Sequence, residues 1–160
     1  QFFGEAAVGP DRGCADLVVA RDVVEHVFDL DDYFGALGSI AHPASDLVLE
    51  TPSLDHHAGT AALNPFHVEH LHVFSLTSLA TLAARHGWDL ARGTVTADGN
   101  LIAWFRRAPG TPRTGRSMPA PPELGSLQSR VDAHHARLRR TLGTGWIVFW
   151  GAGSAGVRLA

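Results

Sequence analysis

Two short segments carry most of the side chains that could do acid–base chemistry. Glu25 and His26 follow directly on an apolar run, and His67, Glu69 and His70 come later, within the sequence FHVEHLHVFS. A histidine titrates close to neutral pH, so it can accept or release a proton there. A carboxylate beside an imidazole orients the ring and raises its basicity. Both segments are therefore candidates for a general base with an orienting partner.

Other uses of these residues remain open from the sequence alone. If the second segment is extended, His67 and Glu69 share one face, while His70 and His72 share the other. Two histidines spaced in this way can share a metal ion, but the spacing is not the helical H-E-x-x-H pattern, and we predict no metal. The remaining alternative is that these histidines are structural, with His26 on a helix surface or capping a helix and Glu25 solvated.

The first segment follows a stretch that predicts a buried parallel strand. The apolar residues of DLVVA, over 16–20, stop abruptly at Arg21 and Asp22. A helix is expected at about 30–41 and a second strand at 46–50, which together make a parallel crossover unit. In open α/β sheets ligands bind outside the carboxyl ends of such strands, so the polar residues there are expected to line a crevice.

The next part of the chain predicts a loop over 53–65, then a helix and a hairpin. Ser75 is the expected N-cap of the helix, and Gly87 its expected terminator. Strands are expected at 88–95 and 101–106, because Asp98-Gly99 between them is typical of a hairpin turn. The sheet should therefore end in an antiparallel pair.

The last third of the sequence changes character. Residues 108–122 contain five prolines and two glycines, which predicts a linker. An amphipathic helix is expected over 123–142, and a strand over 146–150 runs straight into GAGSAG. Such a glycine-rich turn can bring backbone amides to a phosphate at a helix N-terminus, or it can be a tight turn with no nucleotide.

Composition restricts the function classes. A net charge of −3, from 16 acidic and 13 basic residues, disfavours a broad nucleic-acid surface. The single cysteine, Cys14, excludes an internal disulfide and a multi-cysteine zinc site. No apolar run approaches the roughly 18–20 residues of a membrane span, and no secretion signal opens the chain. We expect a cytoplasmic protein whose partner is a small molecule rather than a nucleic acid or a membrane.

The order of these segments resembles the later part of a class I S-adenosylmethionine (SAM)-dependent methyltransferase. More narrowly, it resembles the sugar C-methyltransferases, in which a second Rossmann-like domain follows. The similar stretches are DLVVARDVVEHVFDLDDYFGAL (fourth strand and next helix), SDLVLETPSL (fifth strand), NPFHVEHLHVFSLTSLATLAARHGWDL (substrate-side segment) and WIVFWGAGSAGVRLA (start of the C-terminal domain). In the third stretch, EH followed by FS and SL is the characteristic combination.

The resemblance implies an α/β fold in three parts. Residues 1–107 would be the C-terminal half of the methyltransferase sheet, with parallel strands and a terminal antiparallel hairpin. The linker of 108–122 would follow, and 123–160 would hold a helix and the first strand and turn of the second Rossmann-like domain. The family's glycine-rich SAM loop precedes the fourth strand and is absent here. We therefore expect a fragment that binds SAM poorly and is inactive alone.

The resemblance also assigns roles to residues. His70, Glu69 and His26 would be catalytic, and Ala20, Arg21 and Asp22 would lie at the methyl-donor end of the SAM pocket. His67, which replaces a tyrosine common in the family, and His72 would contact the substrate.

The implied reaction is C-methylation of a nucleotide-linked sugar or related small molecule, after a histidine removes a proton next to a carbonyl. O- or N-methylation on the same fold, an NAD(P)-dependent oxidoreductase using GAGSAG, and a non-catalytic remnant are the alternatives.

Overall fold

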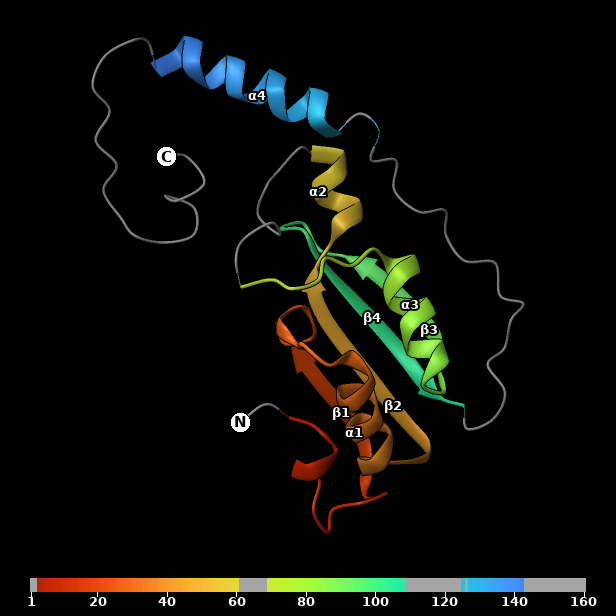
Figure 1. The fold of residues 1–160 in the computed structure, drawn as a ribbon. Helices are drawn as coiled ribbons and strands as arrows, with labels where there is room; N and C mark the ends of the chain where they lie inside the picture. Colours follow the sequence, from red (N-terminus) through yellow and green to blue (C-terminus); the bar gives the residue numbers. More distant parts are fainter. Residues whose placement is uncertain (1–2, 61–68, 109–124, 126, 143–160) are drawn as a thin grey trace.

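The computed structural model describes residues 3–60, 69–108, 125 and 127–142. Within them, one mixed sheet has the strand order β1-β2-β4-β3 (Figure 1). The strands are β1 (Ala15–Arg21), β2 (Ala41–Pro52), β3 (Trp88–Val95) and β4 (Asn100–Arg107). β1 runs parallel to β2, whereas β4 is antiparallel to both β2 and β3. The α/β class, the parallel pair and the terminal hairpin are confirmed.

Helices α1 and α3 cover one face of this sheet (Figure 1). The helical elements are η1 (Glu5–Ala7), η2 (Val24–His26), α1 (Leu30–Ile40), α2 (Leu54–Thr60), α3 (Leu76–Arg85) and α4 (Leu127–Leu142), the η elements being single 3₁₀ turns. Fully buried side chains of the sheet and the two covering helices form the core: Phe34, Leu37, Leu47, Leu49, Leu79, Trp88, Leu101 and Phe105. This core fixes the strand ends on which the polar residues lie.

β1 is less buried than its apolar sequence predicted. Val18 and Ala20 pack against the core, but Leu17 and Val19 are 50% and 55% exposed. Successive strand residues point to opposite faces, and the described helices cover only one of these faces. The prediction of a strand buried on both faces is therefore wrong for this part of the chain.

The predicted loop over 53–65 is also wrong in its first half, because residues 54–60 form α2. The segment has no amphipathic repeat, and hydrogen bonds at its start hold it, two of them local and one to a distant residue. Ser53 accepts from the His56 amide at its side-chain oxygen (3.3 Å) and from the His57 amide at its carbonyl (3.1 Å). The Leu54 amide donates to the Phe74 carbonyl (2.8 Å).

β2 begins at Ala41, directly after α1, and not at Asp46 as expected. Ala15 pairs with Ala41 but Leu17 pairs with Asp46, so β2 contains a bulge between these two pairs. Ser45 closes the bulge, since its hydroxyl donates to the Ala15 carbonyl (2.6 Å) and accepts from the His42 amide (2.8 Å).

The predicted caps agree with the structure. Ser75 caps α3 in a reciprocal capping box with Ser78, and Gly87 ends the helix with a φ of 75°. Gly99, also at positive φ, turns the chain from β3 into β4. No helix of the described residues is long and apolar enough to cross a membrane.

The expected amphipathic helix is present as α4 from Leu127 onwards. Arg130 of α4 donates to the Ala58 carbonyl of α2. The predicted strand at 146–150, the GAGSAG turn and most of the 108–122 linker lie outside the described residues. The division into 1–107, 108–122 and 123–160 therefore stays a prediction.

Candidate functional site

The two segments singled out in the sequence lie side by side in the structure. The amides of Leu71 and His72 both donate to the Glu25 carbonyl, at 2.8 and 3.1 Å. In the other direction, His26 Nδ1 donates to the Glu69 carbonyl at 2.7 Å. Residues 25–26 and 69–72 thus lie together, whereas His67 lies outside the described residues.

A backbone turn at the carboxyl end of β1 sets the direction of this segment. Asp22 has a φ of 52°, in the left-handed region that Asp tolerates better than most residues. Its amide donates to the Glu50 carbonyl of β2 at 2.9 Å, so the parallel pairing extends one residue beyond β1. The chain then leaves the sheet and forms η2, which carries Glu25 and His26.

Glu25 is buried, with 1% of its surface exposed. Thr51 Oγ1 donates to its Oε2 at 3.0 Å, while Oε1 has no donor among the described residues. The expectation of a solvated glutamate is therefore wrong. An unpaired buried carboxylate oxygen is rare, because its desolvation is not compensated. The residues around Glu25 in the sequence carry no signal that this charged side chain is buried.

His26 and His70 lie next to each other at this point. Their rings meet edge to face, with centroids 4.8 Å apart and an interplanar angle of 67°. One donor atom from each of Glu25, His26 and His70 lies within 4.8 Å of the others. We call these three residues the Glu25–His26–His70 cluster. Both imidazoles are half-buried, so the carboxylate is covered while the rings reach the surface.

The other predicted residues of this segment lie around the cluster. Glu69 is exposed, and its printed contact with His26 is made by the backbone carbonyl, not the carboxylate. His72 Nε2 donates to the Val27 carbonyl at 2.9 Å, and its ring lies beside Phe74. His72 therefore connects the segment of residues 69–72 to the chain that follows His26.

The predicted cofactor residues lie at the carboxyl end of β1, with Ala20 and Arg21 on opposite faces of the sheet. Arg21 makes a two-pronged ion pair with Glu50, through Nε (2.5 Å) and Nη2 (3.2 Å). Asn100 adds a third donor to the same carboxylate at 3.0 Å. Hydrogen bonding to Arg21 is the main cause that lowers the pKa of Glu50, and Glu50 in turn raises the pKa of Arg21.

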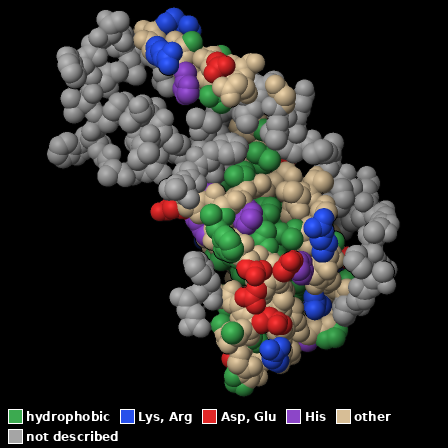
Figure 2. Space-filling view, in the orientation of Figure 1, with side chains coloured by type: hydrophobic (Ala, Val, Ile, Leu, Met, Phe, Trp, Pro, Cys, Tyr) green, Lys and Arg blue, Asp and Glu red, His purple; other side chains and the backbone are tan. Residues whose placement is uncertain are grey.

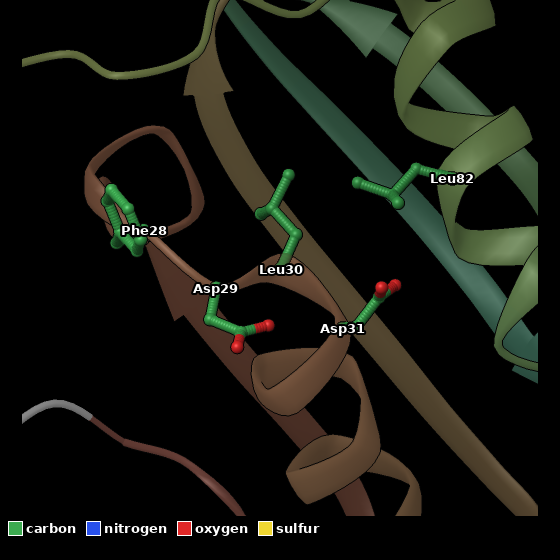
Figure 3. Close-up of a pocket in the computed structure, with 5 residues that line it drawn as sticks. All are labelled: Phe28, Asp29, Leu30, Asp31 and Leu82. Carbon is green, nitrogen blue, oxygen red and sulfur yellow. The ribbon is translucent and has the colours of Figure 1, made fainter.

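A pocket opens two residues after His26. Its volume is about 330 Å³, and it lies between the start of α1 and helix α3 (Figure 3). Its lining is Phe28, Asp29, Leu30, Asp31 and Leu82. Phe28 is 88% exposed, and acidic side chains gather on this face over α1 (Figure 2). The pocket is therefore an open hollow that has both apolar side chains and two carboxylates in its lining.

Comparisons with known proteins bear on this site. A family model described as a methyltransferase domain matches residues 3–92, which include β1, η2 and the segment up to β3. No curated protein matches the chain. One similar solved structure is a complex between the Haloferax volcanii Trm112 methyltransferase activator and a methyltransferase. This match has a TM-score of 0.52 and 10% identity. It covers 61% of this chain and 56% of that chain.

Two further solved structures have lower scores. A SAM-dependent methyltransferase from Aquifex aeolicus has a TM-score of 0.48 and 10% identity, over 61% of this chain and 48% of that one. A 16S rRNA (adenine(1408)-N(1))-methyltransferase from Catenulisporales acidiphilia has a TM-score of 0.48 and 19% identity. This match covers 64% of this chain and 53% of that one. The chain thus spans about half the length of these structures, and the likeness concerns the fold alone. Since the family model matches more than half of the sequence, the chain belongs to the methyltransferase domain family.

Proposed function

We propose that the protein carrying this chain transfers a methyl group from SAM to a carbon atom of a nucleotide-linked sugar or a related small molecule. The family match supports methyl transfer. The observation that carries the carbon acceptor is the meeting of His26 and His70 beside the buried carboxylate of Glu25, at the carboxyl end of β1. A saturated carbon next to a carbonyl must lose a proton before it can attack the sulfonium methyl, and this cluster offers groups that can take one.

In the proposed reaction, a base removes the proton from the carbon next to a carbonyl. The enolate then attacks the sulfonium methyl, a carbon–carbon bond forms, and S-adenosylhomocysteine leaves. We assign the base to His70, its orientation to Glu69, and stabilisation of the oxyanion or proton relay to His26. Because His26 Nδ1 already donates to the Glu69 carbonyl, only its Nε2 is available for this role.

The remaining assignments complete the pocket. Ala20, Arg21 and Asp22 would lie against the methyl-donor end of SAM, since they end the strand that leads into η2. His67 and His72 would lie on the acceptor side. The open pocket next to Phe28 is large enough for part of a small-molecule ligand.

The test is methyl transfer with isotope-labelled SAM and a panel of keto sugars linked to nucleotides, run in deuterated water. We expect exchange at the carbon next to the acceptor carbonyl, and loss of that exchange in His70→Gln. His42→Gln is the matched control, since His42 pairs with the exposed Asp16 at the other end of β1. Methylation of oxygen or nitrogen without exchange at carbon would reject the carbon acceptor and leave an O- or N-methyltransferase.

A further inference from the structure

We propose that Glu25, His26 and His70 bind one divalent transition-metal ion of the zinc class. From the sequence alone no metal is expected, because the second segment does not match the helical H-E-x-x-H pattern. The fold instead brings one carboxylate and two imidazoles together from two separate segments. This inference goes beyond the proposed function, because binding of an ion can be measured without any methyl transfer.

The donor set is one that zinc takes. Two histidine nitrogens and one glutamate oxygen, with a fourth position left open, make up a common type of catalytic zinc site. Each member of the cluster offers one ligand atom, and these atoms lie within 4.8 Å of one another. With bonds of about 2.0–2.2 Å, two ligands of one ion lie up to about 4 Å apart. Small rotations of the side chains are therefore enough to close the site.

The buried carboxylate is an independent observation that points to a cation. Glu25 is 1% exposed, and its Oε1 has no donor among the described residues. Thr51 holds the other oxygen, so the carboxylate cannot turn away without losing that bond. A buried carboxylate needs a compensating positive charge or donor, and an ion held by the two neighbouring histidines would supply one.

The hydrogen bond on His26 is the kind that metal-binding histidines make. Its Nδ1–H donates to the Glu69 carbonyl at 2.7 Å, which fixes the tautomer with the lone pair on Nε2. At most histidine ligands the second ring nitrogen donates to a carboxylate, a backbone carbonyl or water, and this bond orients the ring. The hydrogen bond from Thr51 orients the Glu25 carboxylate in the same way.

The exposure of the rings gives the ion a possible use. His26 and His70 are half-buried, so a fourth position on the ion would be open to water or to an acceptor oxygen. An ion there would polarise the acceptor's carbonyl, which is the role that the proposed mechanism gives to His26. Because the His70 lone pair cannot hold the ion and take a proton together, a hydroxide bound as a fifth ligand, beside the acceptor oxygen, would then be the proton acceptor.

The test begins with protein freed of metal by a chelator and titrated calorimetrically with Zn²⁺. We expect one ion per chain with a Kd in the micromolar range or below. Glu25→Gln, His26→Gln and His70→Gln should each weaken binding by about tenfold or more. His42→Gln and Cys14→Ser are the controls, since His42 pairs with Asp16 and Cys14 is an exposed thiol; both should bind as the wild type does.

A spectroscopic measurement checks the ligands directly. Co²⁺ in the same site should give the visible absorption of a four-coordinate ion, without the charge-transfer band of a thiolate. Glu25→Gln keeps the side-chain volume, and thermal unfolding in the absence of metal verifies that each variant is folded. A wild type that binds no Zn²⁺, or three folded variants that bind it unchanged, would overturn the proposal. Both results are independent of whether the protein methylates carbon.

Discussion

Thr51 donates its hydroxyl hydrogen to Glu25 over 3.0 Å, and the two side chains are 0% and 1% exposed. Thr51 ends the buried face of β2, and Glu25 belongs to η2, which follows β1. One buried polar contact therefore connects the sheet to the Glu25–His26–His70 cluster. The position of the cluster depends on the packing of β2 as well as on its own segment.

The first prediction follows from this contact. Thr51→Val keeps the shape of the side chain but leaves both oxygens of Glu25 without a donor among the described residues. We expect a loss of about 1–3 kcal/mol in the free energy of unfolding, since a buried carboxylate loses its partner. Thr94→Val, at an exposed position of β3, is the control. Equal denaturation midpoints for the two variants would contradict the prediction.

The second prediction concerns Tyr33, the only tyrosine in the sequence. It is 2% exposed, and burial, helped by the negative charge of Glu25, raises its pKa to about 12. The folded protein therefore holds the phenol proton more tightly than the unfolded chain does, whose tyrosine titrates at its ordinary 10.0. This contribution to stability is complete below that value and is lost as the pH rises towards about 12.

Phenolate absorbance, followed against pH together with circular dichroism, tests this directly. We expect no phenolate signal at the ordinary tyrosine pKa while the fold persists. If unfolding comes first, both signals should change together. Titration at the ordinary value in a protein that keeps its circular dichroism would show that Tyr33 is open to solvent.

The third prediction concerns the Arg21–Glu50 pair. Hydrogen bonding to Arg21 lowers the pKa of Glu50 below its ordinary 4.5, so the folded state favours the charged carboxylate. The pair therefore contributes stability above that value, and the contribution disappears as the pH falls through the lowered pKa. Arg21 is 66% exposed, so the effect should be small and salt-dependent.

The free energy of unfolding of Arg21→Gln and of the wild type is measured from neutral to acid pH. The variant should be less stable than the wild type at neutral pH, and the two values should become equal in acid. Arg106→Gln is the matched control, since Arg106 is similarly exposed and lies 3.9 Å from Asp46. A difference for Arg21→Gln that persists unchanged in acid would mean that packing, not charge, causes it.

The fourth prediction uses the left-handed backbone of Asp22. Asp22→Gly should change the free energy of unfolding little, because glycine adopts a φ of 52° without strain. Asp22→Val should cost about 1–2 kcal/mol, since a β-branched residue is strained there. If Asp22 also contacts SAM, as proposed, Asp22→Gly should weaken SAM binding in calorimetry while its stability is kept. Equal stability of the two variants would contradict the backbone argument.

Local signals predicted the elements that carry their own caps and turns. Ser75 begins α3 and Gly87 ends it because both residues satisfy the helix termini by themselves. Asp98-Gly99 likewise indicates its hairpin, since glycine there adopts positive φ. Topology accounts for the place of Glu25 and His26, which follow the carboxyl end of β1, where ligands bind in such sheets. Residues 69–72 directly follow none of the described strands, and only the family resemblance grouped them with His26.

Features that depend on contacts distant in sequence could not be predicted in this way. The start of α2 is held by the Phe74 carbonyl, which accepts from the Leu54 amide, and the sequence of α2 has no helical periodicity. The burial of Glu25 depends on Thr51, 26 residues further along the chain. Its part in the cluster follows from geometry that no spacing rule describes, which is why the sequence favoured Glu69 as the carboxylate.

β1 has one further consequence for work with this chain in solution. Within the described residues it pairs with β2 along one flank, and Leu17 and Val19 are largely exposed on its uncovered face. The other edge of β1 has no partner strand within the described sheet, and such an edge is a template onto which a strand of another molecule can add. Self-association at high concentration should therefore start at this strand. Val19→Lys, which places a charge on β1, is the simplest way to suppress it.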